Sequence, residues 1–228
     1  MDKRMILKSM ENVVSSSVLV AQVLAEIKSD LRKNGCVDIP VFLFHGRYGV
    51  GKTTLVKACM VKEEYTVTFA YPDKEIKQKV KEIPKGVLLL DDFADYNSAS
   101  ARERGKRRVD DWVRFGYAEK DCPILIMTAE NAIFNHLNAS ARSRMLEIEV
   151  PNVYENIELR EIRNYFSSNR DILHNFFREF SEWYLSKNII FQYSVEIEKF
   201  RKNIKRKIVG IWDWYMHIIF HVKFWRVF

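Results

Sequence analysis

The chain has 228 residues, enough for one α/β domain and a smaller additional piece, and its apolar content of 47% is ordinary for a globular protein. Polar and acidic residues interrupt any apolar run at the N-terminus, so no secretory signal is expected. Its three distant cysteines indicate neither a disulfide framework nor a zinc site, and they fit a reducing cytoplasm. Most of the net charge of +7 arises between Lys199 and Phe228, where eight basic residues accompany one acid. This charge predicts nucleic acid or another anionic surface as a partner, with a solvated face as the alternative.

The N-terminal region predicts a helix followed by a buried strand. Apolar residues recur at helical spacing over residues 10–33, and Asn34-Gly35 is a typical helix end. Residues 41–45, VFLFH, are apolar or β-favouring and predict a strand. We expect the helix to pack beside the sheet that contains this strand.

The strand leads directly into a sequence that is typical of phosphate binding. Residues 46–53 read GRYGVGKT and fit the G-x-x-x-x-G-K-[ST] pattern of a P-loop. Its glycines let backbone N–H groups point at phosphate oxygens, and the following helix directs its positive end at the same anion. We expect Lys52 to reach the β- and γ-phosphates of ATP and the Thr53 hydroxyl to bind Mg²⁺. The predicted nucleotide-binding residues are Gly46, Arg47, Tyr48, Gly49, Val50, Gly51, Lys52, Thr53 and Thr54.

A second strand ends in two acids. After a short strand at residues 65–69 and a helix at 73–82, residues 87–90 form an apolar run that ends in Asp91 and Asp92. Such a run is typical of a buried parallel strand whose carboxylates lie at the ligand-binding edge of the sheet. We expect Asp91 to hold Mg²⁺ and Asp92 to orient or deprotonate the attacking water. A role as a strand terminus or helix cap is the alternative.

The region after these acids is basic. Residues 93–105 predict a loop because Ala, Asp, Asn, Ser and Gly dominate it, and residues 106–117 predict a helix. A run of basic side chains crosses this boundary and is a candidate contact for DNA or RNA, with a solvated face as the alternative. The run consists of Arg102, Arg104, Lys106, Arg107 and Arg108.

Two further strands are predicted, each beside a candidate catalytic group. Residues 123–128 predict a strand that ends in Thr128, which we expect to sense the γ-phosphate, with Asn131 as the second choice; an N-cap for the next helix is the alternative role. Within residues 139–150, the apolar Met145, Leu146, Ile148 and Val150 predict a last strand, and Arg142 and Arg144 stand just before it. Either arginine could reach the γ-phosphate of a neighbouring subunit as an arginine finger, and surface ion pairing is the alternative.

The remainder of the chain predicts helices at residues 154–166, 172–185 and 189–204. Residues 205–228 form a basic tail rich in aromatic residues that is too interrupted for a membrane span. An interfacial helix and a partner-binding helix both fit it. The predicted division is therefore a P-loop ATPase domain at 1–152, a helical cap at 153–204 and a tail at 205–228.

The order of these motifs resembles the AAA+ branch of P-loop ATPases over about residues 10–165. More narrowly, it is similar to the ATPase modules of phage-, plasmid- and island-encoded helicase-like replication proteins. The matching features are GRYGVGKTT at 46–54, VLLLDD at 87–92, a basic loop at 105–108, Thr128-Ala129-Glu130, and Arg144 before the last strand.

This resemblance implies a three-layer α/β sandwich with a mostly parallel central sheet, followed by a C-terminal helical region. It also implies ATP and Mg²⁺ as cofactors, catalysis by Lys52, Asp92, Thr128 and an arginine finger, and a homo-oligomer. One function that fits is an ATPase acting on nucleic acid in mobile-element replication or maintenance. A nucleotide-controlled signalling or defence switch, whose C-terminal tail binds a partner or membrane surface, is an alternative. A small-molecule kinase is a third function, against which the lack of an arginine-rich lid argues.

Overall fold

The computed structural model describes residues 3–33, 39–83, 86–93, 98–118, 122–130 and 137–186. Its centre is a five-stranded sheet in the order β2-β3-β4-β1-β5, and every neighbouring pair is parallel. The strands are β1 (Val41–His45), β2 (Thr66–Thr68), β3 (Val87–Phe93), β4 (Ile124–Ala129) and β5 (Met145–Glu149). The helices are α1 (Lys3–Glu11), α2 (Val13–Lys33), α3 (Lys52–Cys59), α4 (Asp73–Glu82), α5 (Ala99–Ala118), α6 (Ala139–Arg142), α7 (Ile157–Ser168) and α8 (Arg170–Ser186).

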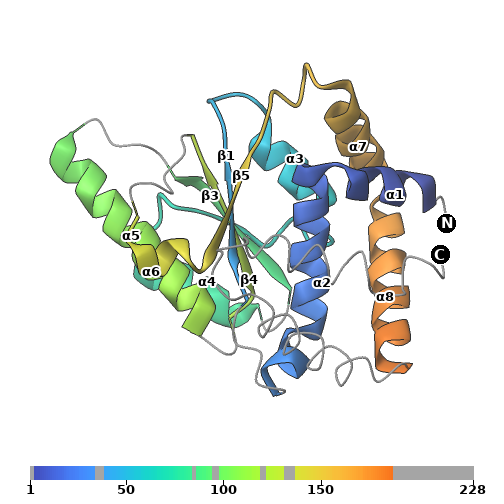
Figure 1. Ribbon diagram of the computed structural model, residues 1–228, viewed down its shortest axis with the longest axis horizontal. Coiled ribbons are helices and arrows are strands. Elements are labelled where there is room, and N and C mark those ends of the chain that lie inside the picture. The colour runs from blue at the N-terminus through green and yellow to red at the C-terminus, as the bar shows by residue number, and fades with distance from the viewer. Residues whose placement is uncertain are drawn as a thin grey trace, which may run out of the picture.

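Helices cover the sheet on both faces (Figure 1). On β1, Phe42 and Phe44 join the apolar cluster formed with α1, α2, α3, α7 and α8, whereas Val41 and Leu43 join the cluster formed with α4, α5 and α6. Successive strand side chains point to opposite faces, so a strand covered on both sides needs a continuous apolar run. The predicted α/β fold with a three-layer arrangement is therefore confirmed.

The helix predicted over residues 10–33 is divided at Asn12 into α1 and α2. The Oδ1 atom of Asn12 accepts hydrogen bonds from the backbone N–H groups of Val14 at 3.0 Å and Ser15 at 3.5 Å, and it thereby caps α2. Its Nδ2 atom donates to Glu158 at 3.0 Å, which links the bend to α7. No single helix in the described ranges is long and apolar enough to cross a membrane, although α1 and α2 together pass that test across a bend of 109°.

The loop predicted for residues 93–105 is wrong from Ala99 onward, because α5 begins there and continues through Gly105 and Arg108. Val109 and Trp112, in the part of α5 that was predicted to be helical, are buried against the sheet. Trp112 also donates from Nε1 to Asp73 at 2.9 Å. The residues before them, Ala99 to Arg104, are mostly Ala, Arg and Glu, which have high helix propensity, so the helix extends toward the N-terminus.

The first two predicted C-terminal helices correspond to α7 and α8. Their residues Leu159, Ile162, Phe166 and Leu173 are buried in the same apolar cluster as one face of the sheet. The helix predicted at 189–204 and the tail at 205–228 lie outside the described residues, so the proposed domain division stays a prediction.

Candidate functional site

The P-loop connects the C-terminal end of β1 to α3, and its geometry accounts for its glycines. Gly49 and Gly51 have φ values of 78° and 88°, in the left-handed region that favours glycine. Gly46 is needed for a different reason, because a Cβ atom there would lie 2.6 Å from the carbonyl oxygen of Val150. The loop therefore has left-handed backbone conformations at Gly49 and Gly51 and no space for a side chain at Gly46.

The segment that follows β5 supports the loop from the side. The backbone N–H of Val150 donates to the carbonyl of His45 at 2.7 Å, and the N–H of Val153 donates to the carbonyl of Val50 at 2.9 Å. These bonds fix the start and the middle of the loop to one neighbouring segment. The P-loop conformation therefore depends on residues about 100 positions later in the sequence.

Lys52, the first residue of α3, places its ammonium group within the loop. Its Nζ atom donates to the carbonyl of Gly46 at 2.7 Å and to that of Arg47 at 2.9 Å. Burial lowers the pKa of Lys52, while the negative charges of Glu130 and Asp91 act in the opposite direction. The side chain thus lies between the loop backbone and the acids at the ends of β3 and β4.

Three polar side chains from three elements meet at the carboxyl edge of the sheet. The Thr53 hydroxyl donates to Oδ1 of Asp91 at 2.6 Å, and the Thr128 hydroxyl donates to the same oxygen at 2.6 Å. The parallel order β3-β4-β1 brings these groups together, because the carboxyl ends of parallel strands lie on one edge. The two predicted Mg²⁺ ligands, Thr53 and Asp91, are therefore direct neighbours.

Asp92 lies in a β-bulge with strained backbone geometry. The pairing of β3 with β4 shifts register between Leu90 and Phe93, and Asp92 has a φ of 64°. Its backbone N–H donates to the hydroxyl oxygen of Thr128 at 2.9 Å. The bulge leaves the Asp92 side chain exposed, whereas Asp91 is half-buried. Strained residues of this kind are frequent at functional sites, where surrounding contacts hold them.

A pocket of about 330 Å³ lies beside these groups. It is lined by Tyr48, Gly49, Gly51, Lys52, Thr53, Thr54, Asp91, Asp92, Thr128, Ala129, Glu130 and Tyr154. The pocket thus gathers most of the predicted nucleotide-binding residues and both predicted acids. Tyr154 was not predicted as a site residue, since no motif marks it, and Glu130 was named only as part of the Thr128-Ala129-Glu130 match. The second-choice sensor Asn131 lies outside the described residues.

The oxygen donors at this edge fit Mg²⁺, which is commonly bound through one or two carboxylates together with substrate phosphates. Thr53 and Asp91 supply a hydroxyl and a carboxylate. Within the part of the chain that the structure describes, no three His, Cys, Asp or Glu side chains gather as a metal site. The pair is therefore suited to a metal that a nucleotide brings with it.

Arg142 and Arg144 lie at the opposite edge of the sheet from their own P-loop. The carbonyl of Arg144 accepts a hydrogen bond at 2.9 Å from the N–H of Val41, the first residue of β1, whereas the P-loop follows the last residue of β1. Arg142 ends α6, just before this point. A role for either arginine at a phosphate would consequently require a second copy of the chain.

The basic run on α5 divides into exposed and internal residues. Arg104 and Arg107 are exposed, Lys106 is half-buried, and the side chain of Arg102 lies outside the described part. Arg108 instead donates hydrogen bonds to Asp73 at 2.7 Å and to the carbonyls of Phe69 and Tyr71, both at 2.6 Å. Arg108 thus joins α5 to the connection between β2 and α4.

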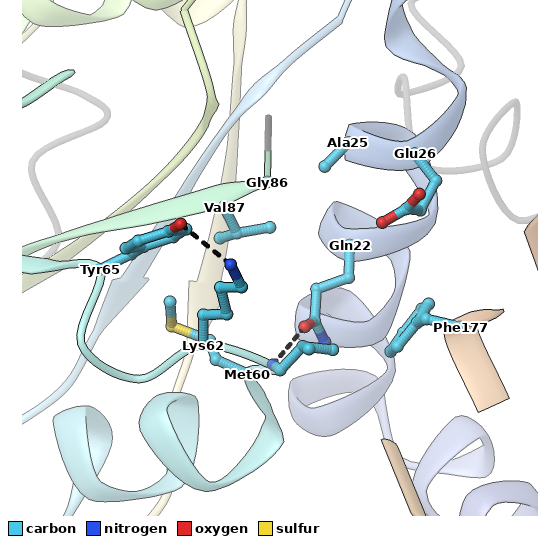
Figure 2. Close-up of a pocket in the computed structure, with 10 residues that line it drawn as sticks. Gln22, Ala25, Glu26, Met60, Lys62, Tyr65, Gly86, Val87 and Phe177 are labelled. Carbon is cyan, nitrogen blue, oxygen red and sulfur yellow. Dashed lines mark hydrogen bonds between the residues drawn. The ribbon is translucent and has the colours of Figure 1, made fainter. Parts of the chain in front are cut away.

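A second pocket, of about 200 Å³, lies at the amino edge of the sheet, where Val87 begins β3 (Figure 2). Gln22 of α2 reaches the end of α3 beside it, donating to the carbonyl of Cys59 at 2.6 Å and accepting from the N–H of Val61 at 2.5 Å. Lys62 donates to the Tyr65 hydroxyl at 3.1 Å. The two hydrogen bonds of the Gln22 amide join α2 to the end of α3, so Gln22 has a structural role.

No protein-family model matches this chain, and no curated protein is similar to it in sequence. Among solved structures, the active helicase Cch of SCCmec type IV is similar, with a TM-score of 0.50 and 12% identity over 89% of this chain. This chain spans about half of that structure, 47% of its length. The inhibitor-bound JCV helicase is matched over 85% of this chain and 65% of its own, with 12% identity and a TM-score of 0.39. The likeness to the Cch helicase shows a P-loop NTPase fold shared with a helicase.

Proposed function

We propose that this protein is a Mg²⁺-dependent ATPase of the AAA+ type that acts on nucleic acid in mobile-element replication or maintenance. The observation that carries the proposal is the contact of the Thr53 hydroxyl with Asp91 at 2.6 Å, directly beside a complete P-loop. A shared fold with a helicase supports the nucleic-acid part. We further propose a homo-oligomer in the cytoplasm, in which Arg142 or Arg144 serves the site of a neighbouring copy.

In the proposed reaction, water attacks the γ-phosphate in line, and the chain supplies position and charge. Lys52 exchanges the carbonyls of Gly46 and Arg47 for phosphate oxygens. Thr53 and Asp91 would hold Mg²⁺, which would supply positive charge to the phosphates of the nucleotide. Asp92 orients or deprotonates the water from its exposed position beside the pocket.

The first test replaces the P-loop lysine. Lys52→Ala is expected to lower ATP turnover by about 10³-fold or more, taking the magnitude of an arginine finger as a guide. Lys57→Ala on the same helix removes the same charge outside the pocket and is expected to leave turnover within about twofold, as is usual for a surface substitution. Equal rates for wild type and Lys52→Ala would remove the ATPase assignment.

A second test concerns nucleic acid. We expect single-stranded or duplex DNA to stimulate ATP turnover at low salt, and the stimulation to fall as salt rises, because phosphate contacts release counterions. Replacing the exposed Arg104 and Arg107 with Ala should weaken the stimulation without affecting basal turnover. Turnover that does not respond to either DNA at low salt would contradict the nucleic-acid part and leave the ATPase part intact.

The arginine finger is tested through oligomer formation. Arg144→Ala is expected to lower turnover while preserving ATP binding, because the arginine lies on the far edge of its own sheet. Mixing Arg144→Ala with Lys52→Ala should restore part of the activity, since an interface that takes its P-loop from Arg144→Ala and its arginine from Lys52→Ala is intact. Failure of the mixture, with a monomeric protein in the presence of a non-hydrolysable ATP analogue, would argue against action in trans.

A further inference from the structure

The pocket beside the P-loop has two chemically different ends. Asp91, Thr128 and Glu130 line one end, where β3 and β4 terminate, and Tyr154 lines the other, just after β5. The strand order β3-β4-β1-β5 places the P-loop, which follows β1, between these ends. One side of the loop therefore faces acids and hydroxyls, and the other side faces an aromatic ring.

Tyr154 is held in place by its surroundings. Its backbone N–H donates to Oδ1 of Asn152 at 3.1 Å, and its carbonyl accepts from the guanidinium of Arg160 at 3.3 Å. Its ring lies against the loop, since a Cβ atom on Gly51 would be 3.2 Å from the Tyr154 Cε2 atom. The guanidinium of Arg163 lies over the ring at 5.0 Å from the centroid, a cation–π distance.

The ring is nevertheless available to a ligand. Tyr154 is 47% exposed, although its backbone is hydrogen-bonded and a cation lies over its ring. Tyr48, the other tyrosine of the pocket, is 87% exposed, so neighbouring residues cover more of Tyr154 than of Tyr48. A half-exposed aromatic ring backed by arginine is the kind of surface on which a nucleobase stacks.

We infer that Tyr154, supported by Arg163, is the platform on which the base of the bound nucleotide stacks. The inference rests on the proposed nucleotide site. Thr53 and Asp91 would hold the Mg²⁺ that accompanies the terminal phosphates, so this pair marks the terminal-phosphate end of the ligand. The nucleoside is attached at the opposite end of the triphosphate and extends toward Tyr154. Since every base has a π-face, the platform recognises the presence of a base more than its identity.

The test compares ATP with inorganic tripolyphosphate, which has the phosphates without a nucleoside, by calorimetric titration in the presence of Mg²⁺. Tyr154→Leu is expected to weaken ATP binding by about tenfold or more, the lower part of the range for base stacking, and to leave tripolyphosphate affinity unchanged. GTP affinity should fall by the same factor. Tyr154→Phe keeps the ring and should bind both ligands like the wild type.

The matched control is Tyr71→Leu. Tyr71 is 42% exposed, carries Lys79 over its ring at 5.2 Å and does not line the pocket, so its removal should change neither affinity. Tyr154→Leu would overturn the inference if it left ATP affinity unchanged, or if it weakened ATP and tripolyphosphate equally, which would indicate a structural role at Gly51. In both cases a loss of ATP binding in Lys52→Ala would still support the proposed function. A wild-type protein that binds neither ligand would overturn both.

Discussion

The buried hydroxyl of Thr128 offers a sharp test of how the candidate site is built. Thr128 is 1% exposed; its hydroxyl donates to Asp91 at 2.6 Å and accepts from the N–H of Asp92 at 2.9 Å. Thr128→Val keeps the shape of the side chain and removes both hydrogen bonds. One bond involves a carboxylate and the other is neutral, so their combined contribution to the free energy of unfolding is about 2–4 kcal/mol.

Thr128→Ser is the matched control, because it keeps the hydroxyl and loses a methyl group worth about 1 kcal/mol. We expect urea unfolding to show Thr128→Val less stable than Thr128→Ser, although Val is the closer match in volume. If Thr128→Val is the less stable variant although it changes the side-chain volume less, the lost stability comes from the missing hydroxyl.

The same substitution should affect turnover more than binding. The left-handed conformation of Asp92 is held by the Thr128 hydroxyl, so its loss lets the bulge relax and moves the Asp92 carboxylate. A displacement of about 1 Å in a catalytic group costs roughly 10²-fold in rate. ATP affinity should change little, because the P-loop is untouched. Equal stability and equal turnover of Thr128→Val and Thr128→Ser would contradict the role of the Thr128 hydroxyl in stabilising the site and positioning Asp92.

Three further predictions follow from single contacts. Gly46→Ala places a methyl group against a backbone carbonyl at 2.6 Å; it should lower stability by about 1–3 kcal/mol and weaken ATP binding, measured by thermal unfolding and titration. Arg108→Ala should lower the free energy of unfolding by about 1–3 kcal/mol, because its three hydrogen bonds join α5 to the β2–α4 connection. Arg107→Ala, at an exposed neighbouring position, should change the free energy of unfolding by no more than about 0.5 kcal/mol. Equal effects of the two substitutions would contradict a structural role for Arg108. Burial raises the pKa of Cys59 to about 12, so its thiol is protonated at pH 8. Peptide mass mapping should therefore show that iodoacetamide labels Cys59 in urea but not in the native protein. Rapid labelling of the native protein would contradict the buried position.

Features that depend on contiguous residues were predictable from the sequence. The conformation of the P-loop is one such feature, since a short run of glycines followed by Lys52 and Thr53 encodes it. The buried strands of the sheet were equally predictable, because burial on both faces demands an unbroken apolar run such as residues 87–90. Even the meeting of Thr53 with Asp91 follows from parallel strands sharing one carboxyl edge.

Other features were decided by contacts between distant segments. Trp112 and Arg108 contact the chain near Asp73, and these contacts place α5 against the connection between β2 and α4. The bulge at Asp92 depends on the Thr128 hydroxyl from the next strand in the sheet. Tyr154 reaches the P-loop because the backbone after β5 bonds to Val50.

The sequence thus determined which residues have the chemistry to bind a metal-bound triphosphate, because that chemistry is local. The tertiary structure alone decided how Asp92 is oriented, which arginines are internal and which aromatic ring borders the site. Those outcomes depend on hydrogen bonds and packing between residues more than 30 positions apart, such as Asp92 and Thr128, whose separation in sequence is 36. Local propensity and periodicity carry no information about such pairs.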